Sequence, residues 1–329
     1  MSDQIKLINH SSILINNDKF KLLTDPWYRG SAFNNGWSLL YENDTNSIEL
    51  ILSNLDYIFI SHEHPDHFSI NFFRDYEKII KKNNIKIIFQ SSQDKRVEKF
   101  LNNMNFEMII LEDKERYKIN DNTYVTIFKQ GHIDSALLCE TDEFYHLNIN
   151  DCNFLNKELK EIKKNIINKK KKIIIYIQFS YASFRANNEW LKQAAIYKLN
   201  NIVNVNNIFD ASLIIPFASF FYFSHSENQH LTKFVNSSLT VTNFLEQNNV
   251  NHCFLNPHTD LIAINKIIQK EITQKKINVD SVNFWNVKRL NAKINFYELD
   301  PVTIDETNIQ IFLQRIKKYN NLFLMFLIR

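Results

Sequence analysis

The sequence predicts an α/β protein in which two mixed β-sheets pack face to face and helices flank them, an αββα sandwich. A block of short strand-like segments is followed by alternating helices and strands, and this order occurs twice along the chain. Such an order is typical of layered sheets with helices on their outer faces. With 329 residues, of which 44% are hydrophobic, the chain is long enough to bury a large core.

The first half contains a series of short apolar or alternating segments, separated by polar breaks, that predict strands. Two segments with helical spacing interrupt the series. The expected strands are 5–9, 12–16, 20–24, 55–60, 85–89, 108–111, 124–129, 136–140 and 144–149, and the expected helices are 71–82 and 93–102.

The second half repeats the mixture and then becomes harder to assign. We expect helices at 155–168, 187–200, 231–246 and 261–274, and strands at 172–178, 213–217 and 252–255. We divide the chain into a catalytic domain, residues 1–264, and a C-terminal extension of helix or strand, residues 265–329. The sequence does not indicate the role of this extension.

Composition excludes several classes of protein. The 27 Phe, 13 Tyr and 4 Trp residues exclude bulk disorder, and a formal charge of +3 gives no indication of a nucleic-acid partner. Three Cys residues without a C-x-x-C pair argue against a disulfide framework and a Cys-based zinc site. No secretory signal or membrane-length apolar run is visible, so we expect a cytoplasmic protein. With only three Gly residues, turns should use Asn and Asp, which tolerate left-handed backbone.

The strongest local motif directly follows the strand predicted at 55–60. It reads Ser-His-Glu-His-Pro-Asp-His and contains His62, His64, Asp66 and His67. Alternation along extended backbone places the first two imidazoles on one side, and the turn at the proline brings the last two groups to a neighbouring point. Imidazole nitrogens with a carboxylate suit Zn, Fe or Mn. A metal site at a strand end explains this spacing better than a His-rich surface loop.

Two further candidates also lie at predicted strand ends. His132 follows the strand at 124–129, and Asp151 follows the strand at 144–149. One edge of the sandwich can bring both to the first motif, where Asp151 would bridge two cations. Taken separately, His132 is better explained as a loop histidine and Asp151 as a helix N-cap.

Taken together, these spacings resemble the metallo-β-lactamase superfamily, whose fold is the αββα sandwich. The opening segments 9–15 and 23–26 are similar to lactonase-like hydrolases and to N-acylphosphatidylethanolamine phospholipase D. Segments 25–41, 150–152 and 214–225 are more similar to the metallo-β-lactamase-like domain of the CMP-N-acetylneuraminate hydroxylases.

The resemblance implies one more metal histidine near the end of a late strand. The matching strand, 213–217, carries Pro216 at about that place. We favour His225 as the replacement ligand over His258. The remaining alternative is that neither replaces it and the second metal site is weak.

Residues near the start of the chain are candidates for substrate binding and for support of the ligands. We assign His10, Trp27, Tyr28 and Arg29 to the substrate mouth, where Arg29 offers a fork for phosphate or carboxylate. His10 is equally well explained as a core residue, and Trp27 is better explained as one. Asp25 is expected to orient a ligating histidine through its second ring nitrogen, with an ordinary turn aspartate as the alternative.

The leading functional hypothesis is a hydrolase that holds one or two divalent ions, zinc before iron or manganese. Asp66 would orient and deprotonate water for attack on an ester, amide or phosphodiester. The alternative is an iron-dependent hydroxylase of a sugar or nucleotide sugar. The sequence has no Cys and His pairs of a Rieske centre. The hydroxylase hypothesis therefore requires a separate electron-transfer partner. A non-catalytic metal-binding relic is the third possibility. The expected partner is a small-molecule substrate that contains phosphate or sugar.

Overall fold

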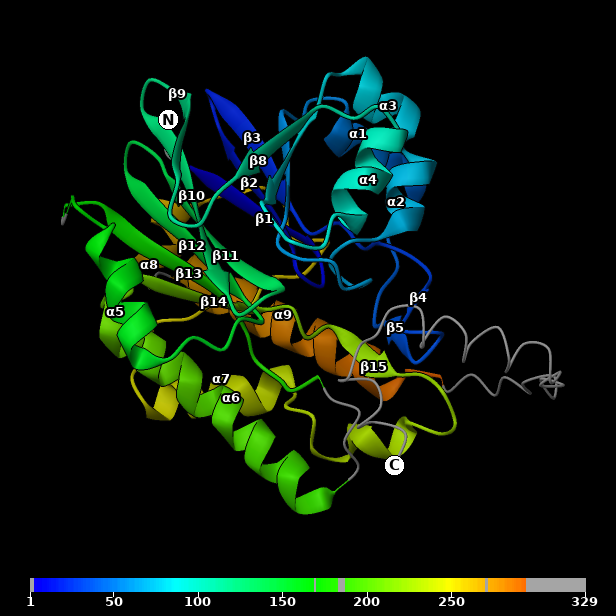
Figure 1. Ribbon diagram of the computed structural model, residues 1–329. Coiled ribbons are helices and arrows are strands. Elements are labelled where there is room, and N and C mark those ends of the chain that lie inside the picture. Colours follow the sequence, from blue (N-terminus) through cyan, green and yellow to red (C-terminus); the bar gives the residue numbers. More distant parts are fainter. Residues whose placement is uncertain (1–2, 169, 183–186, 270–271, 294–329) are drawn as a thin grey trace, which may run out of the picture. The chain divides into compact units, whose positions relative to one another are not determined.

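The computed structural model describes residues 3–168, 170–182, 187–269 and 272–293 of the chain. The described residues all belong to the first of two units, Met1–Ile294. The first unit is an α/β sandwich of two mixed sheets with flanking helices (Figure 1). The predicted fold class is therefore confirmed. The extension predicted at 265–329 lies outside the described residues from 294 onward, and the boundary predicted after residue 264 falls inside the first unit.

The first sheet has seven strands in the order β16-β1-β2-β3-β6-β7-β8. It is mixed because β3, β6, β7 and β8 run parallel, whereas β16, β1, β2 and β3 pair antiparallel. The strands are β1 (Gln4–Asn9), β2 (Ser12–Asn17), β3 (Phe20–Thr24), β6 (Tyr57–Ile60), β7 (Lys86–Gln90), β8 (Met108–Leu111) and β16 (Ile262–Ala263).

The second sheet has six strands in the order β14-β13-β12-β11-β10-β9, and a small third sheet has the order β15-β5-β4. In the second sheet β12, β13 and β14 are parallel and the other pairs are antiparallel. Its strands are β9 (Arg116–Asn120), β10 (Thr123–Gln130), β11 (Asp134–Glu140), β12 (Phe144–Asn150), β13 (Lys172–Gln178) and β14 (Leu213–Phe217). The small sheet consists of β4 (Ser31–Ala32), β5 (Trp37–Leu39) and β15 (Phe221–Phe223).

Helices cover the outer faces of the two large sheets (Figure 1). The first sheet is covered by α1 (Thr45–Leu52), α2 (Ile70–Asp75), α3 (Glu77–Lys82) and α4 (Arg96–Asn103). The second is covered by α5 (Asn156–Lys164), α6 (Asn188–Phe209) and α7 (Ser238–Gln247), and the chain continues through α8 (Ile264–Ile268) and α9 (Ile272–Leu290). Among the described residues, none of these helices is long and apolar enough to cross a bilayer.

One continuous hydrophobic cluster fills the space between the sheets. Phe59 and Ile88 of the first sheet and Val125 and Leu137 of the second belong to it, and all four are almost completely buried. Burial of so much apolar surface is the main favourable term in folding. The two sheets are therefore held firmly enough to fix the loops at their shared edge.

Some predicted elements were wrong in detail because tertiary contacts override local spacing. The helix expected at 71–82 is broken at Tyr76, where α2 ends and α3 begins. The helix expected at 231–246 is a 3₁₀ turn, Gln229–Phe234, followed by α7, which Ser237 caps through the backbone N–H of Thr240. The strand expected at 252–255 makes only an isolated bridge between His252 and Ile214. The helix expected at 261–274 is replaced by β16, α8 and the start of α9.

Asn and Asp supply most of the left-handed backbone, as the composition predicted. In the described part of the chain, eight of the twelve non-glycine residues with positive φ are Asn or Asp. Their short polar side chains bond to nearby backbone, which lowers the cost of this conformation. Two of these residues, Asp25 and Asn150, lie at strand ends beside the candidate site.

Helix α9 completes the core although it lies beyond the predicted domain boundary. Trp285 is only 2% exposed, its ring stacks on Phe220 with centroids 3.8 Å apart, and its indole N–H donates to the carbonyl oxygen of Leu255 at 2.8 Å. A ring packed in this way contributes both buried area and a satisfied hydrogen bond.

Replacement Trp285→Ala should therefore lower the free energy of unfolding by about 3–5 kcal/mol, because it leaves a cavity and an unpaired carbonyl. Urea denaturation followed by circular dichroism measures the change. Val287→Ala on the same helix is the control, since Val287 is 54% exposed. A loss no greater in the tryptophan variant than in the control would place α9 outside the folded core.

Candidate metal centre

The candidate ligands come from strand ends and turns at one edge of the sandwich. His10 lies between β1 and β2, and the His62–His67 motif follows β6. Asp134 begins β11, and Asp151 directly follows β12. Both sheets thus contribute to one site, and their packing decides which side chains meet.

Three residues around this edge have left-handed backbone. The φ angles are 27° at His10, 32° at Asp25 and 60° at Asn150. Such a conformation costs about 1–3 kcal/mol for a residue other than glycine, and it persists only where the surroundings enforce it. Backbone hydrogen bonds do so here, because Ala218 N donates to His10 O at 2.8 Å and Asp25 N donates to Phe59 O at 2.9 Å.

The first group of converging ligand atoms belongs to His62, His64 and Asp134. His62 Nε2 lies 2.9 Å from His64 Nδ1 and 3.8 Å from Asp134 Oδ1. All three ligand atoms lie within 4.8 Å of one another, which is the spacing of side chains around a shared ion. Two imidazoles and one carboxylate thus face a common point.

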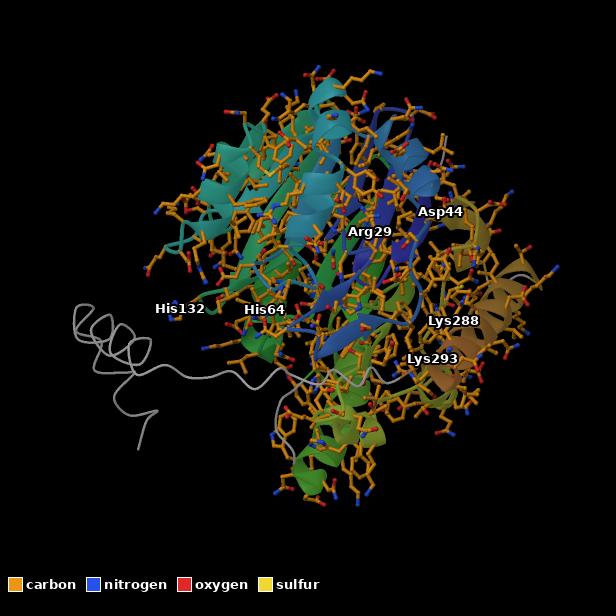
Figure 2. The ribbon with its side chains drawn as sticks, turned by 90° about the vertical axis from the view of Figure 1, so that its right-hand side faces the viewer. Arg29, Asp44, His64, His132, Lys288 and Lys293 are labelled. Atoms are coloured by element: carbon orange, nitrogen blue, oxygen red, sulfur yellow. The ribbon has the colours of Figure 1, made fainter. Side chains whose placement is uncertain are left out.

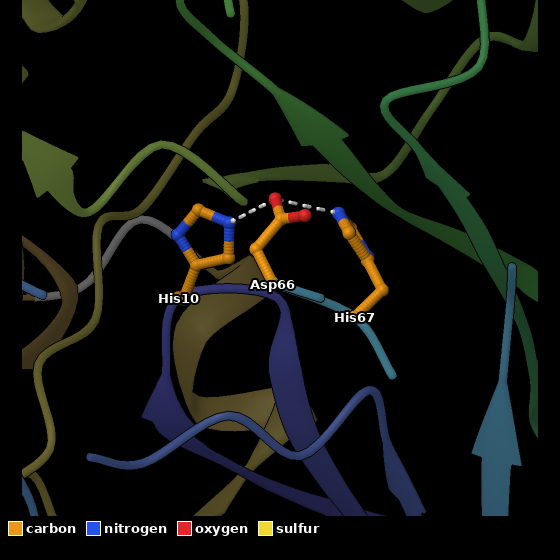
Figure 3. A group of neighbouring side chains, drawn as sticks. All are labelled: His10, Asp66 and His67. Carbon is orange, nitrogen blue, oxygen red and sulfur yellow. Dashed lines mark ion pairs between the residues drawn. The ribbon is translucent and has the colours of Figure 1, made fainter. Parts of the chain in front are cut away.

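The second group belongs to His10, Asp66 and His67 (Figure 3). Asp66 Oδ2 lies 3.4 Å from His10 Nε2 and 3.3 Å from His67 Nε2. All three side chains are buried. This group has the same chemical make-up as the first, two imidazoles and one carboxylate.

Asp151 lies between the two groups. Its Oδ2 is 3.8 Å from His62 Nε2 and 3.8 Å from His67 Nε2. Burial raises the pKa of this carboxyl, but its interactions with His62 and His67 outweigh burial and hold the pKa below its usual value. A carboxylate in this position can bridge two cations, as the sequence predicted for Asp151.

The side chains present fit a bound divalent metal. Several buried ligand atoms have no hydrogen-bond partner among the described residues, although such atoms are normally satisfied. They are both ring nitrogens of His10, Asp66 Oδ1, His67 Nε2, Asp134 Oδ1 and Asp151 Oδ1. The set of imidazole nitrogens and carboxylate oxygens suits zinc, iron or manganese.

A network behind the ligands fixes His67. Its Nδ1 lies 3.0 Å from Asp25 Oδ2, which leaves Nε2 facing the cluster. Asp25 is itself held by the backbone N–H of Ser61 at 2.7 Å and by Asn150 Nδ2 at 2.7 Å. A carboxylate on the second nitrogen sets the tautomer and orientation of a metal-binding imidazole. Asp25 lies where that role requires it.

The electrostatics of the cluster favour a bound cation. Burial lowers the pKa of His62 to about 4, so its imidazole is neutral and able to bind metal. Burial also raises the pKa of Asp66, but His67 and His10 outweigh it and hold this pKa well below its usual value. Burial lowers the pKa of His67, but the charges of Asp66 and Asp151 outweigh burial and raise this pKa well above normal. The site therefore attracts positive charge.

Three histidines predicted as ligands or replacements lie away from the groups described above. His132 is exposed on the turn between β10 and β11 (Figure 2). His225 Nδ1 accepts the backbone N–H of Glu227 at 3.2 Å. His258 is exposed and packs against the rings of Tyr41 and Phe284.

Asp134 occupies the place expected for His132, and it was not among the residues predicted from the sequence. The hairpin turn spans residues 131–133, so β11 begins with Asp134 pointing back into the cluster. Burial and the neighbouring charge of Asp151 raise the pKa of Asp134 to about 6. Its position two residues before the strand predicted at 136–140 was the available indication.

The predicted substrate residues do not line the cavity beside the cluster. His10 is 1% exposed and faces Asp66, while Trp27 and Tyr28 are also buried. Arg29 forms an ion pair with Asp75 at 2.6 Å. His10 therefore belongs with the ligand atoms, and the guanidinium fork is already occupied.

A cavity of about 620 Å³ opens beside the cluster. His64, Asp66 and Asp151 form its polar end, and its other walls are mostly apolar and aromatic. The walls comprise Phe33, Gly36, Trp37, Ala182, Phe223, Glu227, Asn228, His230 and Leu231. Its size falls within the range of small-molecule sites.

A model of the β-lactamase superfamily domain matches residues 4–147. The chain carries a metallo-β-lactamase superfamily domain. The match spans His10, the His62–His67 motif and Asp134, and the predicted superfamily is thereby confirmed.

One known relative is similar to a short segment of this chain, and the similarity is distant. Zebrafish (Danio rerio) cytidine monophosphate-N-acetylneuraminic acid hydroxylase is 34% identical over 62 residues, which are 19% of this chain. The matched segment spans only 10% of that relative.

Solved structures share the fold. Igni18, a metallo hydrolase from Ignicoccus hospitalis, matches with a TM-score of 0.55 and 13% identity over 80% of this chain and 98% of its own. CmlA, a diiron β-hydroxylase from Streptomyces venezuelae, matches with a TM-score of 0.52 and 12% identity over 76% of this chain and 52% of its own. At these identities the matches establish the fold.

Metal content should depend on His64 and Asp134 but not on His132. We expect His64→Ala and Asp134→Ala to weaken metal binding at least about tenfold, since even residues that only support ligands have effects of this size. His132→Ala should bind metal like the wild type. Plasma mass spectrometry after dialysis against graded chelator measures the metal retained. Loss of bound metal in the His132 variant, with the full metal content retained in the Asp134 variant, would reverse this assignment.

Proposed function

We propose that this domain is a metal-dependent hydrolase that acts on an ester, amide or phosphodiester of a small molecule. The observation that carries the proposal is the pair of His and Asp groups that share Asp151 and border a cavity of ligand size. Two-metal sites of this make-up are typical of hydrolytic enzymes.

Divalent ions bound by His62, His64 and Asp134 on one side and by His10, Asp66 and His67 on the other, with Asp151 between, would lower the pKa of water and polarise the scissile group. Asp66 is the residue placed to handle the proton. Its Oδ2 is held between His10 and His67, whereas Oδ1 has no hydrogen-bond partner in the described part of the chain. Asp66 also lines the cavity, so it can orient an attacking water and accept its proton.

The cavity would hold an apolar or aromatic part of the substrate against stacked rings. Trp37 stacks on Phe221 with centroids 3.9 Å apart, and Phe33 lies 4.4 Å from Trp37 and 5.8 Å from His64. Gly36 supports this wall, because a Cβ there would lie 2.9 Å from the carbonyl oxygen of Phe33. The rings thus form a preformed wall that reaches the ligands.

A second candidate is an iron-dependent hydroxylase with a separate electron donor. It is favoured by the make-up of the two groups, since two histidines and one carboxylate are typical of non-haem iron oxygenases. The segment similar to cytidine monophosphate-N-acetylneuraminic acid hydroxylase and the fold shared with a diiron hydroxylase support the same candidate. The reaction separates it from hydrolysis, because only the hydroxylase consumes oxygen.

Turnover by protein loaded with zinc, manganese or iron tests the proposal. We expect hydrolysis of a nitrophenyl ester or of bis(nitrophenyl) phosphate without oxygen consumption. Asp66→Asn should lower kcat at least about 100-fold, the usual contribution of a general base. Asp142→Asn is the matched control, because Asp142 is an exposed aspartate that pairs with Lys19. Oxygen-dependent turnover that requires iron would contradict the hydrolase proposal and support the hydroxylase.

A further inference from the structure

A second cavity, of about 410 Å³, borders the other side of the metal centre. Asp134 and Asp151 form one end, and the remaining walls come mainly from α6 and the end of β13. These walls comprise Asn153, Gln178, Tyr181, Ala182, Trp190, Ala194, Tyr197 and Lys198. The cavity therefore connects the ligands to a single described cationic side chain, Lys198.

Lys198 is unusual because it is a lysine with only 8% of its surface exposed. Its ammonium group donates one hydrogen bond, to Asn153 Oδ1 at 2.9 Å, although it carries three donors. Burial lowers the pKa of this ammonium, although the charges of Asp151 and Asp134 oppose that shift. Among the described residues, no carboxylate forms an ion pair with it. Burying a charge with so few partners is costly, so its retention calls for a ligand or a counter-charge.

Bound metal would change the balance of charge around this cavity. In the apo protein, Asp134 and Asp151 are the negative groups that face Lys198. Once two divalent ions bind, they more than neutralise the three carboxylates of the cluster. The cavity then has a positive centre at one end and an ammonium at the other, with aromatic walls between them.

We propose that this cavity binds the anionic group, carboxylate or phosphate, of the substrate through Lys198. The inference deepens the proposed function and rests on it, because the cluster must hold metal for the cavity to become positive. In this proposal Lys198 holds the anion, which is the role that the sequence predicted for Arg29. The apolar part of the substrate would lie in the larger cavity, which shares Asp151 and Ala182 with this one.

Anion binding by the metal-loaded full chain tests this inference. Inorganic phosphate and acetate are titrated by calorimetry into the wild type and into Lys198→Met, Lys198→Arg and Lys198→Gln. We expect the methionine variant to bind at least one of the two anions about 10-fold to 100-fold more weakly, the usual range for a charge-assisted hydrogen bond. The arginine variant should recover part of the affinity. Lys192→Met, an exposed change on the same helix, should bind like the wild type.

The outcomes separate this inference from the proposed function. If Lys198→Met does not fold, Lys198→Gln takes its place, because it retains a donor for Asn153 without the charge. Unchanged affinity for both anions at full metal content would overturn the role of Lys198 and leave the hydrolase proposal intact. Loss of metal that matches the loss of anion binding would instead make Lys198 a counter-charge for the cluster and also overturn the inference. A wild-type protein that binds no metal would remove the proposed function itself.

Discussion

The gathering of three carboxylates and four imidazoles, all of them buried or half-buried, at one edge of the sandwich is the constraint on which the rest of the structure depends. Charged or unpaired polar groups are expensive to bury, and several ligand atoms here have no hydrogen-bond partner among the described residues. A bound cation removes that cost because it replaces the missing partners. Three residues beside the cluster, His10, Asp25 and Asn150, also have left-handed backbone.

The two sheets are needed to assemble this cluster. The first sheet supplies the His62–His67 motif, His10 and Asp25, whereas the second supplies Asp134 and Asp151. Neither sheet alone completes the two ligand groups and the carboxylate between them. The hydrophobic cluster that joins the sheets therefore controls the geometry of the site, and α9 contributes to that cluster through Trp285.

The centre divides the space around it into two chemically different cavities. One has stacked aromatic walls, and the other has the buried ammonium of Lys198. Asp151 borders both, so a substrate bound across them would present its middle to the ligands. This arrangement suits a small molecule with an apolar part and an anionic part on either side of the bond that reacts.

Local sequence predicted the parts of this site that are local in structure. His62, His64, Asp66 and His67 lie within six residues after one strand, so their convergence follows from a single turn. The substitution of Asp134 for His132 depends on where a hairpin turn ends, because His132 lies in the turn and Asp134 begins the strand that follows it. The aromatic wall depends on the pairing of β5 with β15, strands of three residues that lie far apart in the sequence. Such short strands have too little periodicity to be recognised before the fold is known.

Anomalous X-ray diffraction from crystals of metal-loaded protein, collected at the absorption edges of zinc, iron and manganese, tests the central claim most directly. We predict two peaks about 3.5–4 Å apart, the usual separation in two-metal sites, with Asp151 between them. Asp134 should bind one ion and His67 the other. A single peak, or two peaks that Asp151 does not touch, would contradict the assignment of a shared centre.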